Sequence, residues 1–211
     1  MHGPRSDRSP RWAGARTPLH VRVRLDGTRP RRWHAALLRR ISDTPGILSV
    51  SVDDAPGPGT WPPTADLLFR LEALIHGLQP LGAAPLPLDE LDRWRHRDTA
   101  ADLVIDLCGD VPPGPATWQL AYDGAPGEVA LLDALLAHAV PRATLVADGR
   151  IVAEGRLGAD RPGVVLASFD DALARTVTVI TAALRDRLAG RDRAPAGSAK
   201  PAGRPGGLTI R

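Results

Sequence analysis

The chain has 211 residues, 43% of them hydrophobic, which is enough for one domain of ordinary size with an apolar core. Its net charge of +3 is unevenly distributed, because residues 1–17 carry +3, residues 189–211 carry +4 and the segment between them about −4. The basic charge therefore belongs to the two ends, which argues against nucleic-acid binding by a folded basic face. A single cysteine excludes an internal disulfide and favours the reducing cytoplasm, and no apolar run is long enough for a membrane-spanning helix.

Residues 1–17 and 189–211 are rich in Arg, Pro and Gly and hold few residues that could be buried. We predict that they form two disordered basic tails. Residues 18–188 alternate strand-like and helix-like patterns, which predicts one α/β domain.

The first half of this domain is predicted to form a strand, a helix and a second strand. Residues 21–25 alternate apolar and polar side chains, which predicts a strand with one polar face that ends at Asp26-Gly27. A helix then begins near Pro30 and carries Trp33, Leu37 and Ile41 on one face. A strand over 47–52 completes a unit of the size of a βαβ crossover. A second amphipathic helix follows, with Thr64 as its N-cap and apolar residues at 67, 71, 74, 75 and 78.

The segment 101–110, ADLVIDLCGD, is a short apolar run that ends in Cys108 and Gly109. Such a run predicts a strand buried on both faces, as in a parallel sheet with helices on each side. Open α/β sheets bind ligands beyond the carboxyl ends of their strands, so Asp26, Gly27 and Gly109 are candidate ligand-binding residues. Cys108 fits a small core residue better than a nucleophile, because the sequence places no histidine beside it.

The second half predicts a strand over 117–122, a helix that Pro126 opens, and two strands on either side of the turn Asp148-Gly149. The last helix is predicted to start with a capping box of Ser168 and Asp171 and to end at Gly190. The whole pattern predicts a Rossmann-like three-layer α/β fold with a mostly parallel sheet, a C-terminal β-hairpin and a long final helix.

Five segments in this order resemble the N-terminal domain of the folate-dependent formyltransferases, and especially its divergent bacterial relatives. The strand in 101–110 matches the buried strand of the family, and TWQLAY at 117–122 occupies the segment of its Asn-x-His motif. Residues 126–139 match the helix that follows, residues 143–157 a strand pair with an Asp-x-Gly-like element, and residues 167–184 the closing helix. The resemblance implies formyl transfer from 10-formyltetrahydrofolate in a biosynthetic pathway.

The sequence departs from this family at the reactive groups. It contains no Asn, so the Asn-His-Asp triad cannot be assembled, and the matching positions hold Trp118-Gln119, Leu120-Ala121 and Glu154. In that chemistry the His transfers protons, the Asp orients it and the Asn stabilises an oxyanion. We therefore expect a catalytically degenerate domain that binds a small molecule or a partner protein, with the folate cofactor bound only if the family activity is retained.

Two alternatives stay open. An active formyl- or glycosyl-group transferase would use another set of residues, with Asp123 and Glu154 as its acidic groups and Trp118 as a stacking surface for the ligand. A structural partner of a separate enzyme would use the basic tails to steer association with an acidic surface. A metal site is not expected, because His34, His76 and His138 have no second ligand at helical spacing.

Overall fold

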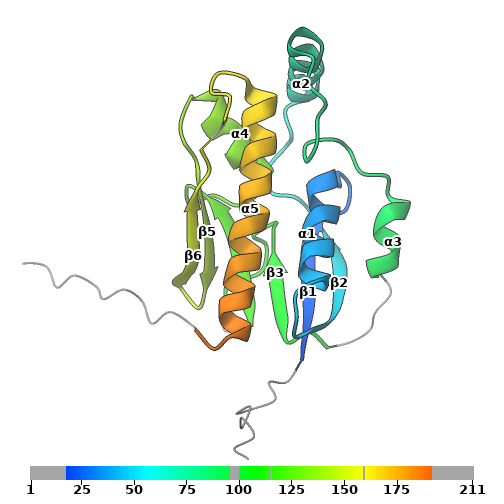
Figure 1. The fold of residues 1–211 in the computed structure, drawn as a ribbon, viewed down its shortest axis with the longest axis vertical. Coiled ribbons are helices and arrows are strands. Elements are labelled where there is room, and N and C mark those ends of the chain that lie inside the picture. The colour runs from blue at the N-terminus through cyan, green and yellow to red at the C-terminus, as the bar shows by residue number, and fades with distance from the viewer. Residues whose placement is uncertain (1–17, 96–99, 115, 159, 192–211) are drawn as a thin grey trace, which may run out of the picture.

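The structure, a computed structural model, describes residues 18–95, 100–114, 116–158 and 160–191, so almost all of the two predicted tails lies outside the described residues. The described residues form an α/β protein with a mixed six-stranded sheet of order β2-β1-β3-β4-β5-β6 (Figure 1). The strands are β1 (Leu19–Asp26), β2 (Ile47–Ala55), β3 (Leu103–Asp106), β4 (Thr117–Tyr122), β5 (Arg142–Ala147) and β6 (Arg150–Arg156). The helices are α1 (Arg32–Ser42), α2 (Pro63–His76), α3 (Asp89–Arg95), α4 (Glu128–Leu136) and α5 (Val165–Leu188).

The first four strands of the chain run parallel to one another. Strand β1 pairs with both β2 and β3, and β3 pairs with β4, so the carboxyl ends of all four lie at one edge of the sheet. Strand β5 is antiparallel to β4, and β6 is antiparallel to β5. The strands predicted on either side of Asp148-Gly149 thus pair with each other, and both turn residues have the positive φ that a two-residue turn of this kind requires.

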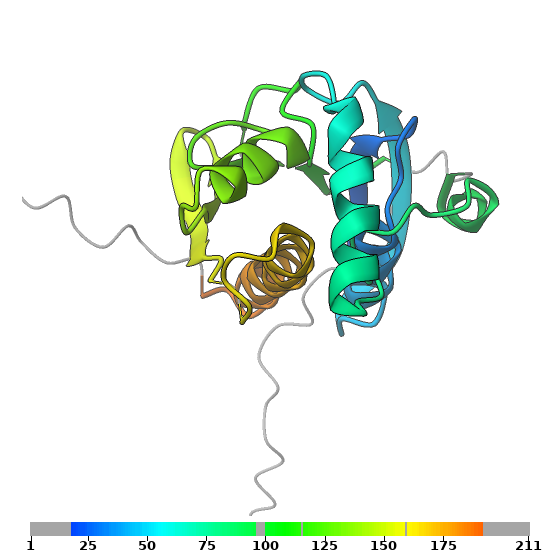
Figure 2. The same ribbon diagram turned by 90° about the horizontal axis from the view of Figure 1, so that it is seen from above.

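The helices pack on one face of the sheet, so the described fold has two layers and not the three that the sequence predicted. Helices α1 and α5 cover that face, α2 and α4 contact α5, and α3 contacts β2 (Figure 2). Along β1, Val21, Val23 and Leu25 are buried beneath the helices, whereas Arg22 and Arg24 are half-buried on the opposite face. A short apolar run such as 103–105 occurs both in strands that helices cover on one face and in strands that helices cover on both faces. The run therefore could not show that one face of this sheet lacks a helical layer among the described residues.

Helix α5 begins one turn earlier than the predicted capping box. Its first residue is Val165, and Ser168 lies inside the helix, where its hydroxyl donates to the carbonyl of Arg161. The cap comes from another helix: the carboxylate of Glu72 in α2 accepts hydrogen bonds from the backbone N–H groups of Val165 (3.1 Å) and Leu166 (2.6 Å). A negative charge at this end also interacts favourably with the helix dipole.

We expect Glu72→Gln to lower the free energy of unfolding by about 1 kcal/mol, because the amide keeps one acceptor oxygen but loses the charge and the second acceptor. Urea denaturation followed by circular dichroism measures the change. Glu154→Gln is the matched control, since Glu154 lies in β6, away from any helix start, and its exposed ion pair with Arg142 should cost less than about 0.5 kcal/mol when lost. Equal losses in both variants would contradict the capping role.

Helix α2 turns its apolar stripe away from the core. Its buried residues are Ala65 and Phe69, while Leu74 is 81% exposed and Ile75 is 72% exposed. The amphipathic pattern therefore predicted the helix correctly but does not mark the side that faces the core. Among the described residues, no helix has the length and apolar character needed to cross a membrane.

Candidate functional site

A cavity of about 340 Å³ opens at the edge of the sheet where β1, β3 and β4 end. Its lining comes from the ends of these strands, from the loop 56–61 after β2 and from the first residues of α1 and α4. This is the place where open α/β sheets bind ligands, because the loops that follow neighbouring strands diverge there. The volume is in the range of cavities that hold a small organic molecule.

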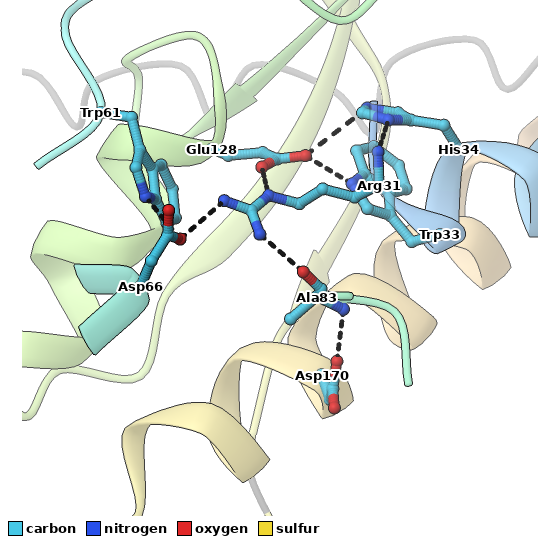
Figure 3. A network of polar contacts seen from close by, with 8 residues as sticks. All are labelled: Arg31, Trp33, His34, Trp61, Asp66, Ala83, Glu128 and Asp170. Atoms are coloured by element: carbon cyan, nitrogen blue, oxygen red, sulfur yellow. Dashed lines mark hydrogen bonds and ion pairs between the residues drawn. The ribbon is translucent and has the colours of Figure 1, made fainter. Parts of the chain in front are cut away.

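Arg31, the residue before α1, forms the centre of a buried polar network beside this cavity (Figure 3). Its Nε donates to Oε2 of Glu128 at 2.7 Å, and its Nη1 donates to the carbonyl of Ala83 at 2.6 Å. Its Nη2 lies 3.9 Å from Oδ1 of Asp66. The guanidinium also stacks 4.2 Å above the ring of Trp61, whose indole N–H donates to Asp66. The charge of Arg31 is therefore neutralised and bonded within the protein.

Glu128, the first residue of α4, presents its carboxylate to the start of α1. Besides the bond from Arg31, its Oε1 accepts a hydrogen bond from the indole N–H of Trp33. Burial raises the pKa of Glu128, and the charge of Asp26 raises it further, while Arg31 and Trp33 oppose the shift. The side chain keeps 17% of its surface exposed and lines the cavity. It is thus a carboxylate fixed in position at the cavity wall.

His34 lies against Glu128 but has no free basic nitrogen. Its Nδ1 accepts a hydrogen bond from the backbone N–H of Arg31 at 3.0 Å, so the ring proton is on Nε2, which lies 3.5 Å from Oε1 of Glu128. Burial and the neighbouring Arg31 charge lower the pKa of His34 to about 3. The imidazole is therefore neutral at physiological pH, and its basic nitrogen, Nδ1, is occupied by the Arg31 N–H.

The segment 81–86 closes the N-terminus of α1. The carbonyls of Ala84 and Gly82 accept hydrogen bonds from the backbone N–H groups of Arg32 (2.9 Å) and Trp33 (3.1 Å). Asp170 of α5 holds this segment in turn, because its carboxylate accepts from the N–H groups of residues 81 and 83. In dinucleotide-binding α/β folds the corresponding N–H groups bind phosphate. Here they are already bonded within the chain.

Two glycines allow the loops around the cavity to approach one another. A Cβ on Gly57 would lie 2.5 Å from Oδ2 of Asp26, and a Cβ on Gly127, whose φ is +85°, would lie 2.4 Å from Cγ of Pro58. No other residue fits either position without displacing its neighbour. The loop after β2 therefore packs closely against the end of β1 and the start of α4, and this contact encloses the cavity.

The structure brings only part of the predicted site together. Asp26 lines the cavity, whereas the other three candidate ligand-binding residues, Gly27, Gly109 and Trp118, are not among its lining residues. Trp118 is buried in the core, where the guanidinium of Arg187 lies 5.7 Å from its ring centre. It therefore offers no stacking surface to a ligand in this cavity.

The two candidate acidic groups of a transferase, Asp123 and Glu154, lie outside the cavity lining. Both contact Arg142 at the start of β5: Asp123 accepts from its backbone N–H at 3.1 Å, and Glu154 lies 3.5 Å from its Nη1. They are exposed side chains whose contacts connect β4, β5 and β6. The structure thus places both acidic groups around Arg142 and outside the cavity.

Sequence reasoning missed Arg31, Glu128 and Trp61 as site residues and considered His34 only as a metal ligand. Arg31 and Glu128 are 97 positions apart, so no local pattern connects them. A usable signal was the position of Arg31 at the start of a helix that directly follows a strand, where α/β folds place their ligand sites.

The remaining reactive groups do not form a second chemical centre among the described residues. No cluster of three or more His, Cys, Asp or Glu side chains suited to a metal ion occurs in the part of the chain that the structure describes. Cys108 lines the cavity, and burial together with the charge of Asp106 raises its pKa to about 12. Its thiol is therefore protonated at physiological pH and is a poor nucleophile.

Comparison with protein-family models, curated proteins and solved structures finds no match to this chain.

Proposed function

We propose that this chain is an α/β domain of the formyltransferase type that binds a small molecule at the carboxyl edge of its sheet and lacks the catalytic triad of that family. The observation that carries the proposal is the cavity of about 340 Å³ enclosed by the loops after β1, β2 and β3 and the start of α4. The order of its sequence segments supports the family resemblance, and the cavity lies where open α/β sheets bind their ligands.

The chemistry of the lining favours binding over catalysis. A general base needs a free basic atom in contact with substrate, and the basic nitrogen of His34, Nδ1, already accepts a hydrogen bond from the backbone N–H of Arg31. The thiol of Cys108 is protonated, and Asp123 and Glu154 lie outside the lining. Glu128 is held by Arg31 and Trp33, which fixes it as a recognition group. The proposed cytoplasmic domain therefore acts as a ligand-binding module in a biosynthetic pathway.

Thermal denaturation with a panel of folates, including 10-formyltetrahydrofolate, and of nucleotide sugars tests this function. A ligand at a hundred times its Kd should stabilise the folded state by about 2.7 kcal/mol. Val129→Trp, which places a large side chain in the cavity lining, should abolish the stabilisation. Val152→Trp on the exposed side of β6 is the matched control and should preserve it. A stabilisation that survives Val129→Trp would place binding elsewhere and contradict the proposal.

A further inference from the structure

We infer that the part of the cavity beside Asp26 and Glu128 selects a flat group of the ligand that carries cationic N–H donors, such as an amidinium, which bonds to the two carboxylates. This inference rests on the proposed function, since it names the chemical class that the same cavity takes. Both carboxylates line the cavity, one at the end of β1 and the other at the start of α4.

The buried cation of the site is not available to an anionic group of a ligand. Arg31 donates to Glu128 and to the Ala83 carbonyl, and its guanidinium stacks on Trp61. The other basic residue with a permanent charge in the lining is Arg29, which is exposed. The N–H groups at the start of α1 are bonded to residues 82 and 84. An anion would therefore meet no unoccupied buried donor from Arg31 or from this end of α1.

The carboxylates of Asp26 and Glu128, by contrast, can accept further hydrogen bonds. Oδ1 of Asp26 accepts from the N–H and the hydroxyl of Thr28, whereas its Oδ2 accepts no hydrogen bond from the described residues. Glu128 accepts from Arg31 and Trp33 and remains partly exposed, and a carboxylate has about four acceptor positions. A donor group in the cavity can therefore bond to both carboxylates without displacing an existing partner.

The charged side chains around Cys108 at these strand ends are mostly acidic. The charges of Asp106, Asp110 and Asp26 all raise the pKa of the Cys108 thiol, which lines the same cavity. Arg24, which pairs with Asp110 at 2.8 Å, opposes them only in part. A cationic group is favoured in such surroundings, and a second anion is disfavoured.

The apolar lining determines the shape of the ligand. The rings of Trp33, Trp61 and Tyr122 line the cavity together with Leu107 and Leu120. Each aromatic ring is nearly buried and held within the core, so the walls are rigid and suited to a flat apolar body. A ring that carries an amidinium combines this body with two parallel N–H donors, which match a carboxylate in the same way as a guanidinium does.

Benzamidine, benzamide and benzoate test the inference, because they share size and shape and differ in charge. The shift of the Trp61 indole N–H signal, measured by NMR in titrations of the full chain, reports binding in the cavity. We expect benzamidine to bind about tenfold more tightly than benzamide, and benzoate to bind most weakly. Benzoate binding as tight as that of benzamidine would overturn the ligand class and leave the proposed function intact. If none of the three probes and no ligand of the folate and nucleotide-sugar panel moved the Trp61 signal, both would be wrong.

Asp26→Asn isolates the contribution of one carboxylate. The amide oxygen keeps the bonds from Thr28, so the fold should persist, while benzamidine should bind about tenfold more weakly and benzamide should be unaffected. Asp133→Asn on the exposed side of α4 is the matched control and should leave all three affinities unchanged. Unchanged benzamidine binding by Asp26→Asn would overturn the role of Asp26. If the Asp26→Asn variant fails to fold, the affinities of benzamidine, benzamide and benzoate for the unmodified chain still decide the inference.

Discussion

Replacement of Arg31 by Met is expected to lower the free energy of unfolding by about 3–5 kcal/mol, the largest effect of any substitution at the site. The change leaves the Glu128 carboxylate buried without its cation and removes the hydrogen bond to the Ala83 carbonyl. It also removes the stacking on Trp61. Urea denaturation at neutral pH, followed by far-ultraviolet circular dichroism, measures the loss.

Two further variants identify the cause of this loss. Arg39→Met removes an exposed ion pair with Glu90 and should cost less than about 1 kcal/mol. The double variant Arg31→Met/Glu128→Gln removes the stranded charge together with its partner and should recover part of the stability that Arg31→Met loses. A loss below about 1 kcal/mol in Arg31→Met, or a double variant less stable than it, would contradict a buried ion pair at this position.

The second large effect is a loss of stability in acid that originates at His34. Its pKa is near 6.5 in the unfolded chain and about 3 in the folded protein. Between these values the unfolded state binds a proton that the folded state does not, so stability falls as the pH falls from 6.5 towards 3. The slope from this one group reaches about 1.4 kcal/mol per pH unit and vanishes below the lower value.

Glu128 acts in the opposite direction. Its pKa is raised in the folded protein, so above the ordinary value of 4.5 the folded state holds a proton that the unfolded state has lost. The stability that Glu128 contributes is therefore lost as the pH rises from 4.5 through its raised pKa in the folded protein. It is regained as the pH falls back over the same range. Below pH 4.5 this compensation ends, and the effect of His34 should appear at its full slope.

Comparison of the unmodified chain with His34→Gln separates the histidine from the other titrating groups. The difference in unfolding free energy between the two should shrink from pH 6.5 downwards, because the variant has no imidazole to protonate. Leu173→Ala, a core variant without a titrating group, should keep a difference that does not depend on pH. A constant difference for His34→Gln as well would show that the histidine does not titrate differently on folding.

The sequence determined the elements whose rules are local. Alternation of apolar and polar side chains predicted β1, the spacing of Trp33, Leu37 and Ile41 predicted α1, and Asp148-Gly149 predicted the turn between β5 and β6. Each of these signals involves residues within one element or one turn. Asp26, which the sequence places at the end of a strand, lines the cavity, and its role in ligand binding stays a prediction.

Only the tertiary structure decided which surfaces meet. The start of α5 depends on Glu72, 93 positions before Val165, and the site depends on a contact between Arg31 and Glu128. Tertiary packing also decides that the apolar stripe of α2 is exposed and that the described helices cover only one face of the sheet. Hydrophobic periodicity shows that a segment is amphipathic but not which neighbour covers its apolar side. The partner of a buried charge likewise depends on how segments far apart in the sequence pack together.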